Sequence, residues 1–238
     1  MDSTVYPIDC KNAAPSLVLH FRQIKEMMND NRSITFEISI NHVEDINKED
    51  LTVQDNLSTK FLQACYEGDI KKLNPLLLTK EPINFNAKVK NGRTGFMIAC
   101  NQGSLQIVKK LVRISVDQSI YLDTTDDFGM TAFMIAVNEN QFDIVKYLLE
   151  SPKVQIDFNK KGLQDETPFM NACYYGHKEI VELFLNSQTE IDFDARDLYG
   201  DTALTHAREN GHEDIVELLE PHVCEVPQRK KAKFSKWT

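Results

Sequence analysis

The sequence of 238 residues has no apolar run close to the roughly 18 residues that a membrane-spanning helix needs. Its first ten residues hold neither a basic cluster nor an apolar stretch, so we expect no secretory signal. The five cysteines are odd in number and form no C-x-x-C pair, which argues against a disulfide framework and a zinc knuckle. These absences favour an intracellular protein, located in the cytoplasm, the nucleus or both.

Catalytic motifs and an excess of positive charge are also missing. There is no G-x-x-x-x-G-K, H-E-x-x-H or G-x-S-x-G sequence. The 27 Lys and Arg residues are outnumbered by 36 Asp and Glu residues, which gives a net charge of -9. A general binder of nucleic acid or of anionic membranes needs clustered positive charge, so neither class is expected. We predict no cofactor and no small-molecule substrate.

What the sequence contains instead is a repeat over most of its length. Residues 94–100, 131–137 and 167–173 spell TGFMIAC, TAFMIAV and TPFMNAC, and residues 59–65 and 202–208 extend the pattern on both sides. The threonines that open these segments lie 35, 37, 36 and 35 residues apart. The spacing predicts five units over residues 57–223, which we number repeats 1 to 5. Their approximate bounds are 57–89, 90–125, 126–161, 162–196 and 197–223.

Each repeat predicts two antiparallel helices joined by a tight turn. The turn residue is Asn140 in repeat 3 and a glycine in the other repeats, at positions 68, 103, 176 and 211. After the turn, apolar residues recur at i, i+1, i+4 and i+5, which makes one helical face. The helices keep a fixed spacing, whereas the connections between repeats vary in length. We therefore expect the helices to stack and the connections to face solvent.

This pattern resembles the ankyrin repeat, a unit of about 33 residues with a β-turn, two helices and a T-P-L-H-x-A signature. The best match is TPFMNA at residues 167–172, and DLYGDT at residues 197–202 matches the family's D-x-x-G-x-T turn, as do residues 126–131. The resemblance covers roughly 70% of the chain and implies an all-α solenoid of stacked helix-turn-helix units with β-hairpin fingers.

Three departures from the family pattern carry predictions. Connections two to four residues longer than the family's imply longer fingers, most of all between Val112 and Thr131. Pro75 lies in the second helix of repeat 1, where it should kink the helix or remove a hydrogen bond. The signature His is absent, so its hydrogen bonds must be lost or substituted. Its replacements are Met97, Met134, Met170, Thr205 and Gln63, and we interpret the methionines as a ladder in the core.

The first 56 residues do not fit the repeat. Leu17, Phe21, Ile24 and Met28 share one helical face, and residues 34–40 alternate apolar and polar side chains as a strand does. We expect a small α/β cap over the exposed face of repeat 1, with a separate interaction element as the alternative.

Residues 224–238 form a basic tail. From residue 225 onward its charge is +4, so the rest of the chain carries -13. The cluster of Arg229, Lys230, Lys231 and Lys233 fits a short nuclear-import signal. The alternatives are a solvated disordered tail and a segment that contacts phosphates or the acidic body of the protein itself.

Cysteines and histidines, which could act as nucleophiles or metal ligands, recur at the repeat spacing. This regularity favours structural roles for them. Cys65, Cys100 and Cys173 occupy one slot of the repeat, so we interpret them as packing residues instead of nucleophiles. His177 and His212 occupy another slot of the repeat. Ligands placed one per repeat would not converge on the same metal ion. The sequence therefore predicts no catalytic site and no metal site.

Candidate binding residues lie at the finger tips and on the exposed side of the first helices, where ankyrin repeats bind partners. Seven of them are apolar or aromatic: Phe128, Met130, Leu163, Tyr174, Tyr175, Leu198 and Tyr199. Five are acidic: Asp127, Glu139, Glu166, Asp201 and Glu209. Exposed apolar patches mark interfaces, and acidic neighbours favour a partner with basic residues around an apolar anchor. The alternative is that some of the rings pack on neighbouring fingers.

We predict a non-catalytic adaptor, scaffold or inhibitor that binds a protein or peptide on its concave and finger surface. A second hypothesis is a nuclear regulator resembling the NF-kappa-B inhibitors, which mask a basic segment of a transcription factor. A third is a targeting subunit that recruits an enzyme partner. No membrane partner is expected, and nucleic acid is expected to bind only weakly, through the tail.

Overall fold

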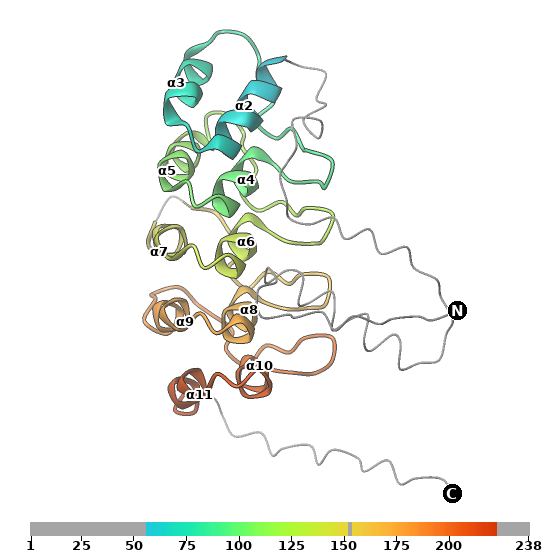
Figure 1. Ribbon diagram of the computed structural model, residues 1–238, viewed down its shortest axis with the longest axis vertical. Helices are drawn as coiled ribbons and strands as arrows, with labels where there is room; N and C mark the ends of the chain where they lie inside the picture. The colour runs from blue at the N-terminus through green and yellow to red at the C-terminus, as the bar shows by residue number, and fades with distance from the viewer. Residues whose placement is uncertain (1–55, 152–153, 223–238) are drawn as a thin grey trace, which may run out of the picture.

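The computed structural model describes residues 56–151 and 154–222. Within these ranges the chain forms ten helices that stand in two columns (Figure 1). The inner column, next to the finger loops, consists of α2 (Asn56–Glu67), α4 (Gly95–Asn101), α6 (Ala132–Asn138), α8 (Pro168–Tyr175) and α10 (Ala203–Glu209). The outer column consists of α3 (Ile70–Leu78), α5 (Leu105–Ile114), α7 (Phe142–Glu150), α9 (Lys178–Leu185) and α11 (Glu213–Leu219).

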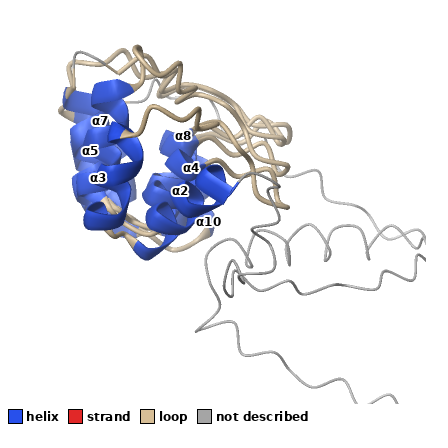
Figure 2. Cartoon of the chain, turned by 90° about the horizontal axis from the view of Figure 1, so that it is seen from above, coloured by secondary structure: helices blue, strands red, loops and turns tan. Residues whose placement is uncertain are grey.

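The view along the stack shows the inner helices between the outer helices and the finger loops (Figure 2). The fold is the all-α solenoid that the sequence predicts. No helix in the described part of the chain combines the length and the apolar character that crossing a membrane would require. The predicted N-terminal cap and the basic tail lie outside the described residues, apart from Asn56, which begins α2.

A threonine opens the inner helix of repeats 2 to 5 because its side chain caps that helix. The N-cap residues are Thr94, Thr131, Thr167 and Thr202. In each of them Oγ1 accepts the backbone N–H of the residue three positions later, at donor–acceptor distances between 3.1 and 3.4 Å. Such a cap stabilises a helix by about 1 kcal/mol relative to alanine. Threonine therefore recurs at the repeat spacing.

The methionines in the family's His slot replace one backbone hydrogen bond. The N–H of Thr94 donates to Sδ of Met97 at 3.4 Å, and the N–H of Thr167 donates to Sδ of Met170 at 3.5 Å. Met97, Met134 and Met170 are all buried in the core. The hydrogen bond of the lost His is thus substituted in repeats 2 and 4 by a thioether that also packs as an apolar side chain.

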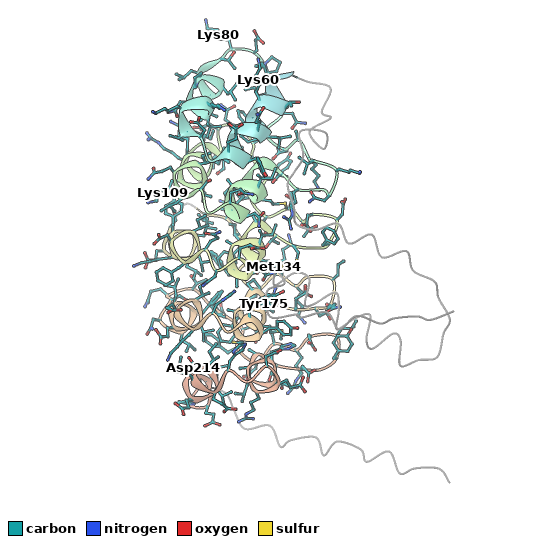
Figure 3. The ribbon with its side chains drawn as sticks, viewed as in Figure 1. Lys60, Lys80, Lys109, Met134, Tyr175 and Asp214 are labelled. Atoms are coloured by element: carbon teal, nitrogen blue, oxygen red, sulfur yellow. The ribbon has the colours of Figure 1, made fainter. Side chains whose placement is uncertain are left out.

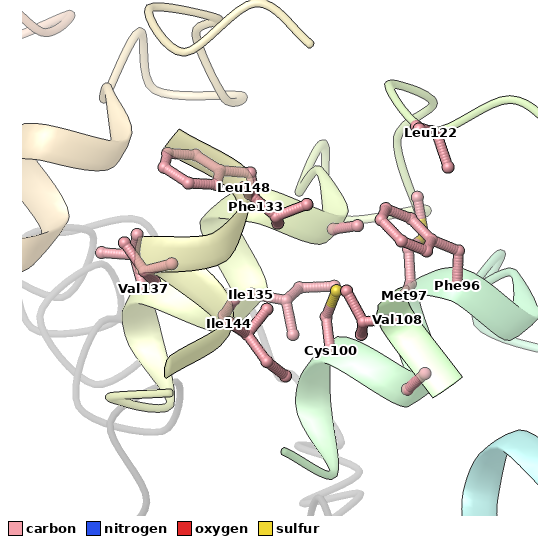
Figure 4. Packing of buried hydrophobic residues seen from close by; sticks show 14 of the residues in the cluster. Phe96, Met97, Cys100, Val108, Leu122, Phe133, Ile135, Val137, Ile144 and Leu148 are labelled. Carbon is pink, nitrogen blue, oxygen red and sulfur yellow. The ribbon is translucent and has the colours of Figure 1, made fainter. Parts of the chain in front are cut away.

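Phenylalanines form the centre of the core. Phe61, Phe96, Phe133 and Phe169 follow the repeat threonines by two positions, and each is at most 1% exposed. Rings from the connections pack edge-on against three of them: Phe85 on Phe61, Phe158 on Phe133 and Phe193 on Phe169, with centroids 4.8 to 5.1 Å apart. Figure 4 shows the buried side chains of repeats 2 and 3 around Phe96 and Phe133. Each buried ring contributes roughly 1.5–3 kcal/mol, so the core stabilises the whole stack.

The turn inside a repeat leaves room for a side chain of the next repeat. A Cβ on Gly103 would lie 2.5 Å from Oε1 of Gln141, and a Cβ on Gly176 would lie 2.4 Å from Cε1 of His212. Both glycines also have positive φ, 69° and 75°, which other residues rarely adopt. Glycine is therefore required at these turns by the backbone and by the neighbouring repeat.

The side chains that fill these turns connect successive repeats. Each donates a hydrogen bond of 3.0 Å to a backbone oxygen near the end of the previous inner helix. The pairs are Gln141 with Asn101, His177 with Asn138, and His212 with Tyr174. Burial lowers the pKa of His177, which favours the neutral imidazole. The two histidines therefore hold repeats together.

Repeat 1 departs from the other repeats. Thr59 lies inside α2, which begins at Asn56, and not at its N-cap. The residue three positions after Thr59 is the buried Leu62, so the assignment of Gln63 to the His slot is wrong. α3 continues through Pro75 and buries only Leu73, whereas α5 buries four residues. The outer helix of repeat 1 is therefore held less firmly than its equivalents.

Repeat 5 replaces two apolar slots with charges. Arg208 occupies the slot of the buried Cys173, and Glu220 occupies the slot of Leu185. The two side chains form an ion pair at 2.9 Å and both remain largely exposed. This pair makes the outward face of α10 and α11 polar, as a terminal repeat requires.

Candidate interaction surface

Within the described residues, four finger loops end in five-residue tips: residues 89–93, 126–130, 162–166 and 197–201. In every tip the N–H of the first residue donates to the carbonyl of the fifth, at 2.9 or 3.0 Å. In two tips, Oδ1 of Asp126 or Asp197 accepts two further N–H groups, each at 2.9 Å. The tips are therefore held in a fixed conformation by their own hydrogen bonds.

Neighbouring tips are joined in pairs. The N–H of Asp127 donates to the carbonyl of Asn91 at 3.1 Å, which connects the tips of repeats 2 and 3. The N–H of Leu198 donates to the carbonyl of Gln164 at 2.8 Å, which connects the tips of repeats 4 and 5. Arg93 and Asp126 add a largely buried ion pair at 3.2 Å to the first of these pairs.

The β-hairpin pairing expected in the described fingers is limited to single bridges. The described residues pair as isolated antiparallel bridges, Lys88 with Thr94 and Thr125 with Thr131. Hydrogen bonds to side chains and to adjacent tips replace a longer ladder.

The prediction of longer fingers between Val112 and Thr131 is wrong. The tip of repeat 3 has the same length as the others, and the extra residues form a turn after α5 in which the N–H of Ile120 donates to the carbonyl of Ser115 at 2.8 Å. Contacts between adjacent fingers fix the length of each finger. The end of an outer helix has more freedom to accommodate an insertion.

Four of the seven predicted apolar residues are exposed. Leu163, Leu198, Tyr199 and Phe128 are 71%, 66%, 56% and 48% exposed. All four lie on the tips of repeats 3 to 5, and Leu163 approaches the glycine of the neighbouring tip, Gly129. Met130 is instead half-buried against the core.

The prediction that Tyr174 is an exposed contact residue is wrong. Its side chain is only 7% exposed and packs edge-on against His206 of repeat 5, with ring centroids 5.7 Å apart. Tyr175 is half-buried and stacks on His177. The alternative, that some rings pack within the stack, is thus correct for Tyr174.

The predicted acidic residues occupy two environments. Asp127 and Glu209 are exposed, whereas Glu139, Glu166 and Asp201 are half-buried. Burial raises the pKa of Glu139 although the charge of Arg93 opposes the shift. Burial also raises the pKa of Glu166. The pKa of Tyr175 is raised mainly by burial and further by Tyr174 and by these two carboxylates, which therefore lie near it.

Four exposed apolar side chains were not among the predicted residues: Leu78, Val116, Tyr121 and Phe142. Val116 and Tyr121 are 79% and 61% exposed, and both lie in the connection between α5 and the finger of repeat 3. The extra length of that connection is the sequence feature that points to them, because inserted residues have no slot in the stack.

The cysteines of the repeat are buried thiols. Burial raises the pKa of Cys65, Cys100 and Cys173 far above the ordinary value, so each remains a protonated packing group. Among the described residues, no three His, Cys, Asp or Glu side chains gather closely enough to hold a metal ion.

A comparison with known families agrees with this geometry. The family model for ankyrin repeats (3 copies) matches residues 61–162 and 153–229, which together make up most of the chain. The chain belongs to the ankyrin-repeat family. The family indicates a protein–protein interaction module, which is generally not catalytic. No curated protein matches the chain.

Proposed function

We propose that this protein is a non-catalytic adaptor, scaffold or inhibitor that binds a protein or peptide through the finger tips of repeats 3 to 5. The exposed apolar side chains on hydrogen-bonded tips are the observation that supports this most directly. Leu198 and Tyr199 stand next to each other on a tip that is joined to the tip of Leu163. A rigid apolar pair loses little conformational freedom on binding, which favours affinity.

The partner is expected to combine apolar and basic groups. Asp127 and Glu209 are exposed, and Glu166 lies at the base of the tip that carries Leu163. Negative charge around an apolar patch attracts a positively charged partner and orients it during encounter. A partner with an aromatic or aliphatic anchor between Lys or Arg residues fits both features.

Matched double variants test this proposal. The tip variant carries Leu198→Ala and Tyr199→Ala, and the control carries Val116→Ala and Tyr121→Ala, which removes an even more exposed apolar pair elsewhere. Each protein is immobilised and used to capture partners from a lysate of the source cells, and captured proteins are quantified by mass spectrometry. We expect the tip variant to lose its partners at least tenfold and the control to retain them, with both unfolding free energies changed by less than about 0.5 kcal/mol. Unchanged capture by the tip variant would rule the proposal out.

A further inference from the structure

Charge is distributed unevenly along the stack. Residues 56–125, in repeats 1 and 2, contain ten Lys and Arg and five Asp and Glu, a net charge of +5. Residues 162–222, in repeats 4 and 5, contain three Lys and Arg and 14 Asp and Glu, a net charge of -11. Figure 3 shows Lys60, Lys80 and Lys109 toward one end of the stack and Asp214 at the other. The acidity of the protein is thus concentrated in its last two described repeats.

The three cations of repeats 4 and 5 already have partners there. Lys178 lies 3.5 Å from Asp214, Arg208 lies 2.9 Å from Glu220, and Arg196 donates to the carbonyl of Gly200 at 2.7 Å. They offset only a small part of the negative charge. Repeats 4 and 5 therefore attract further cations.

The same two repeats carry the most exposed of the apolar tip residues. Leu163 and Leu198 stand on tips that are hydrogen-bonded to each other, and Tyr199 follows directly. These two tips, residues 162–166 and 197–201, contain four acidic residues and no Lys or Arg. A ligand that binds them needs several positive charges and at least one large apolar side chain.

The C-terminal segment of the chain has this chemistry. Residues 225–238 contain five Lys and Arg and one Glu, together with Phe234 and Trp237. The segment follows the described part of the chain at His222, directly after α11 of the acidic repeat 5. The positive charge of the tail complements the acidic tips, and the tail follows the repeat that carries one of these tips.

The chain is long enough for the tail to reach the tips. The 12 residues from His222 to Phe234 can span up to about 40 Å. In repeat 4, the 11 residues from Ser187, in the slot equivalent to His222, already reach Leu198 on the next tip. A short tether gives an effective concentration on the order of 1 mM. A tail that binds with a dissociation constant of about 100 µM as a separate peptide would occupy the face about 90% of the time when tethered.

We propose that residues 225–238 dock on the acidic, apolar-tipped face of repeats 4 and 5 and compete there with external partners. This inference rests on the proposed function, because the tail is expected to carry the same chemistry as the partner. Partner binding is then controlled by whatever displaces the tail, and a more basic or more apolar ligand displaces it more readily.

A titration with the tail itself tests the docking. A fluorescein-labelled peptide of residues 225–238 is titrated with the full chain and with a chain that ends at residue 222, and binding is followed by fluorescence anisotropy. We expect the shortened chain to bind the peptide at least tenfold more tightly than the full chain, and higher salt to weaken that binding. Equal binding by the two chains, or no binding to the shortened chain, would overturn the inference.

Two controls locate the contact. In the shortened chain, Leu198→Ala with Tyr199→Ala should weaken peptide binding at least fivefold, whereas Val116→Ala with Tyr121→Ala should leave it unchanged. A full chain with the photo-cross-linker benzoylphenylalanine at position 234 should form intramolecular cross-links within residues 162–209. Cross-links confined to residues 56–125, or formed only between chains, would contradict the proposed face.

The outcomes separate the two proposals. If the shortened chain binds the tail peptide but captures no other partner, the docking stands and the proposed function fails. If both chains capture a partner equally well through the tips, the proposed function stands and the docking fails.

Discussion

Repeats 1 and 2 and repeats 4 and 5 are built from the same pair of helices, yet they present different surfaces. The first two carry a net charge of +5 and place exposed apolar residues at the end of α3 and in the connection after α5. The last two carry -11 and place exposed apolar residues on hydrogen-bonded tips. Repeat 2 and repeat 4 share the capping threonine, the buried phenylalanine and the turn glycine, so these positions determine the stack. The exposed positions differ between the two regions and therefore determine what each region can bind.

The largest effect is expected from a cavity in the shared core. Phe169→Ala removes a ring that packs against Phe184 and Phe193, and Phe96→Ala removes the equivalent ring in repeat 2. Each should lower the free energy of unfolding by about 3–5 kcal/mol, measured by urea denaturation. Phe169→Leu, the conservative control, should cost less than about 1.5 kcal/mol. If only one of the two alanine variants were destabilised, the two regions would not share one core.

A pair of glycine substitutions compares a packed turn with an open one. Gly176 and Gly200 both have positive φ, but a Cβ would meet His212 at Gly176 and nothing within 4 Å at Gly200. Gly200→Ala should cost about 1–2 kcal/mol for the left-handed backbone alone. Gly176→Ala should cost a further 1–3 kcal/mol because the ring of His212 must move. Thermal or urea denaturation measures both, and equal losses would show that His212 does not restrict the turn.

The smallest expected effect is a pH dependence of the free energy of unfolding that has opposite signs for a carboxylate in repeat 4 and one in repeat 1. Burial raises the pKa of Glu166 in the folded protein above its value of about 4.3 in the unfolded chain. Between these two pKa values the folded state keeps a proton that the unfolded chain has released. The free energy of unfolding therefore falls as pH rises through the folded-state pKa. A hydrogen bond from Lys72 lowers the pKa of Glu67, so its contribution is present above the unfolded pKa and is lost as pH falls through the folded value.

Glutamine substitutions measure this difference. Relative to the unchanged protein, Glu166→Gln should gain stability between pH 4 and pH 7, whereas Glu67→Gln should lose stability between pH 3 and pH 7. Urea midpoints at these pH values provide the measurement. The same sign for both variants would contradict the assignment of burial to one carboxylate and of a hydrogen bond to the other.

The parts of the structure that the sequence predicts are those in which every repeat has the same neighbours. Phe133 meets the same surroundings as Phe169, so its burial follows from its position in the repeat. The exposure of Tyr174 could not be predicted in this way, because it depends on His206, which the other repeats do not have at that position.

The position of inserted residues is the second feature that the sequence predicts wrongly. A longer connection shows that residues have been added but not where they emerge, and hydrogen bonds between fingers place them after α5. The exposure of Leu198 and Tyr199 was predicted correctly because a tip residue lies beyond the reach of the helices, and their role in binding stays a prediction. The cap formed by residues 1–56 and the import signal at residues 229–233 stay predictions.

The contacts at the turns also restrict the order of the repeats. The turn at Gly103 accommodates Gln141, and the turn at Gly176 accommodates the larger ring of His212. In repeat 3 the corresponding turn residue is Asn140, and there the incoming side chain is His177. The repeats are therefore not interchangeable parts. A chain with repeats 3 and 5 exchanged would keep every helix but would give the turns of repeats 2, 4 and 5 a different neighbouring side chain, so shuffled versions of this protein should fold less stably than the natural order.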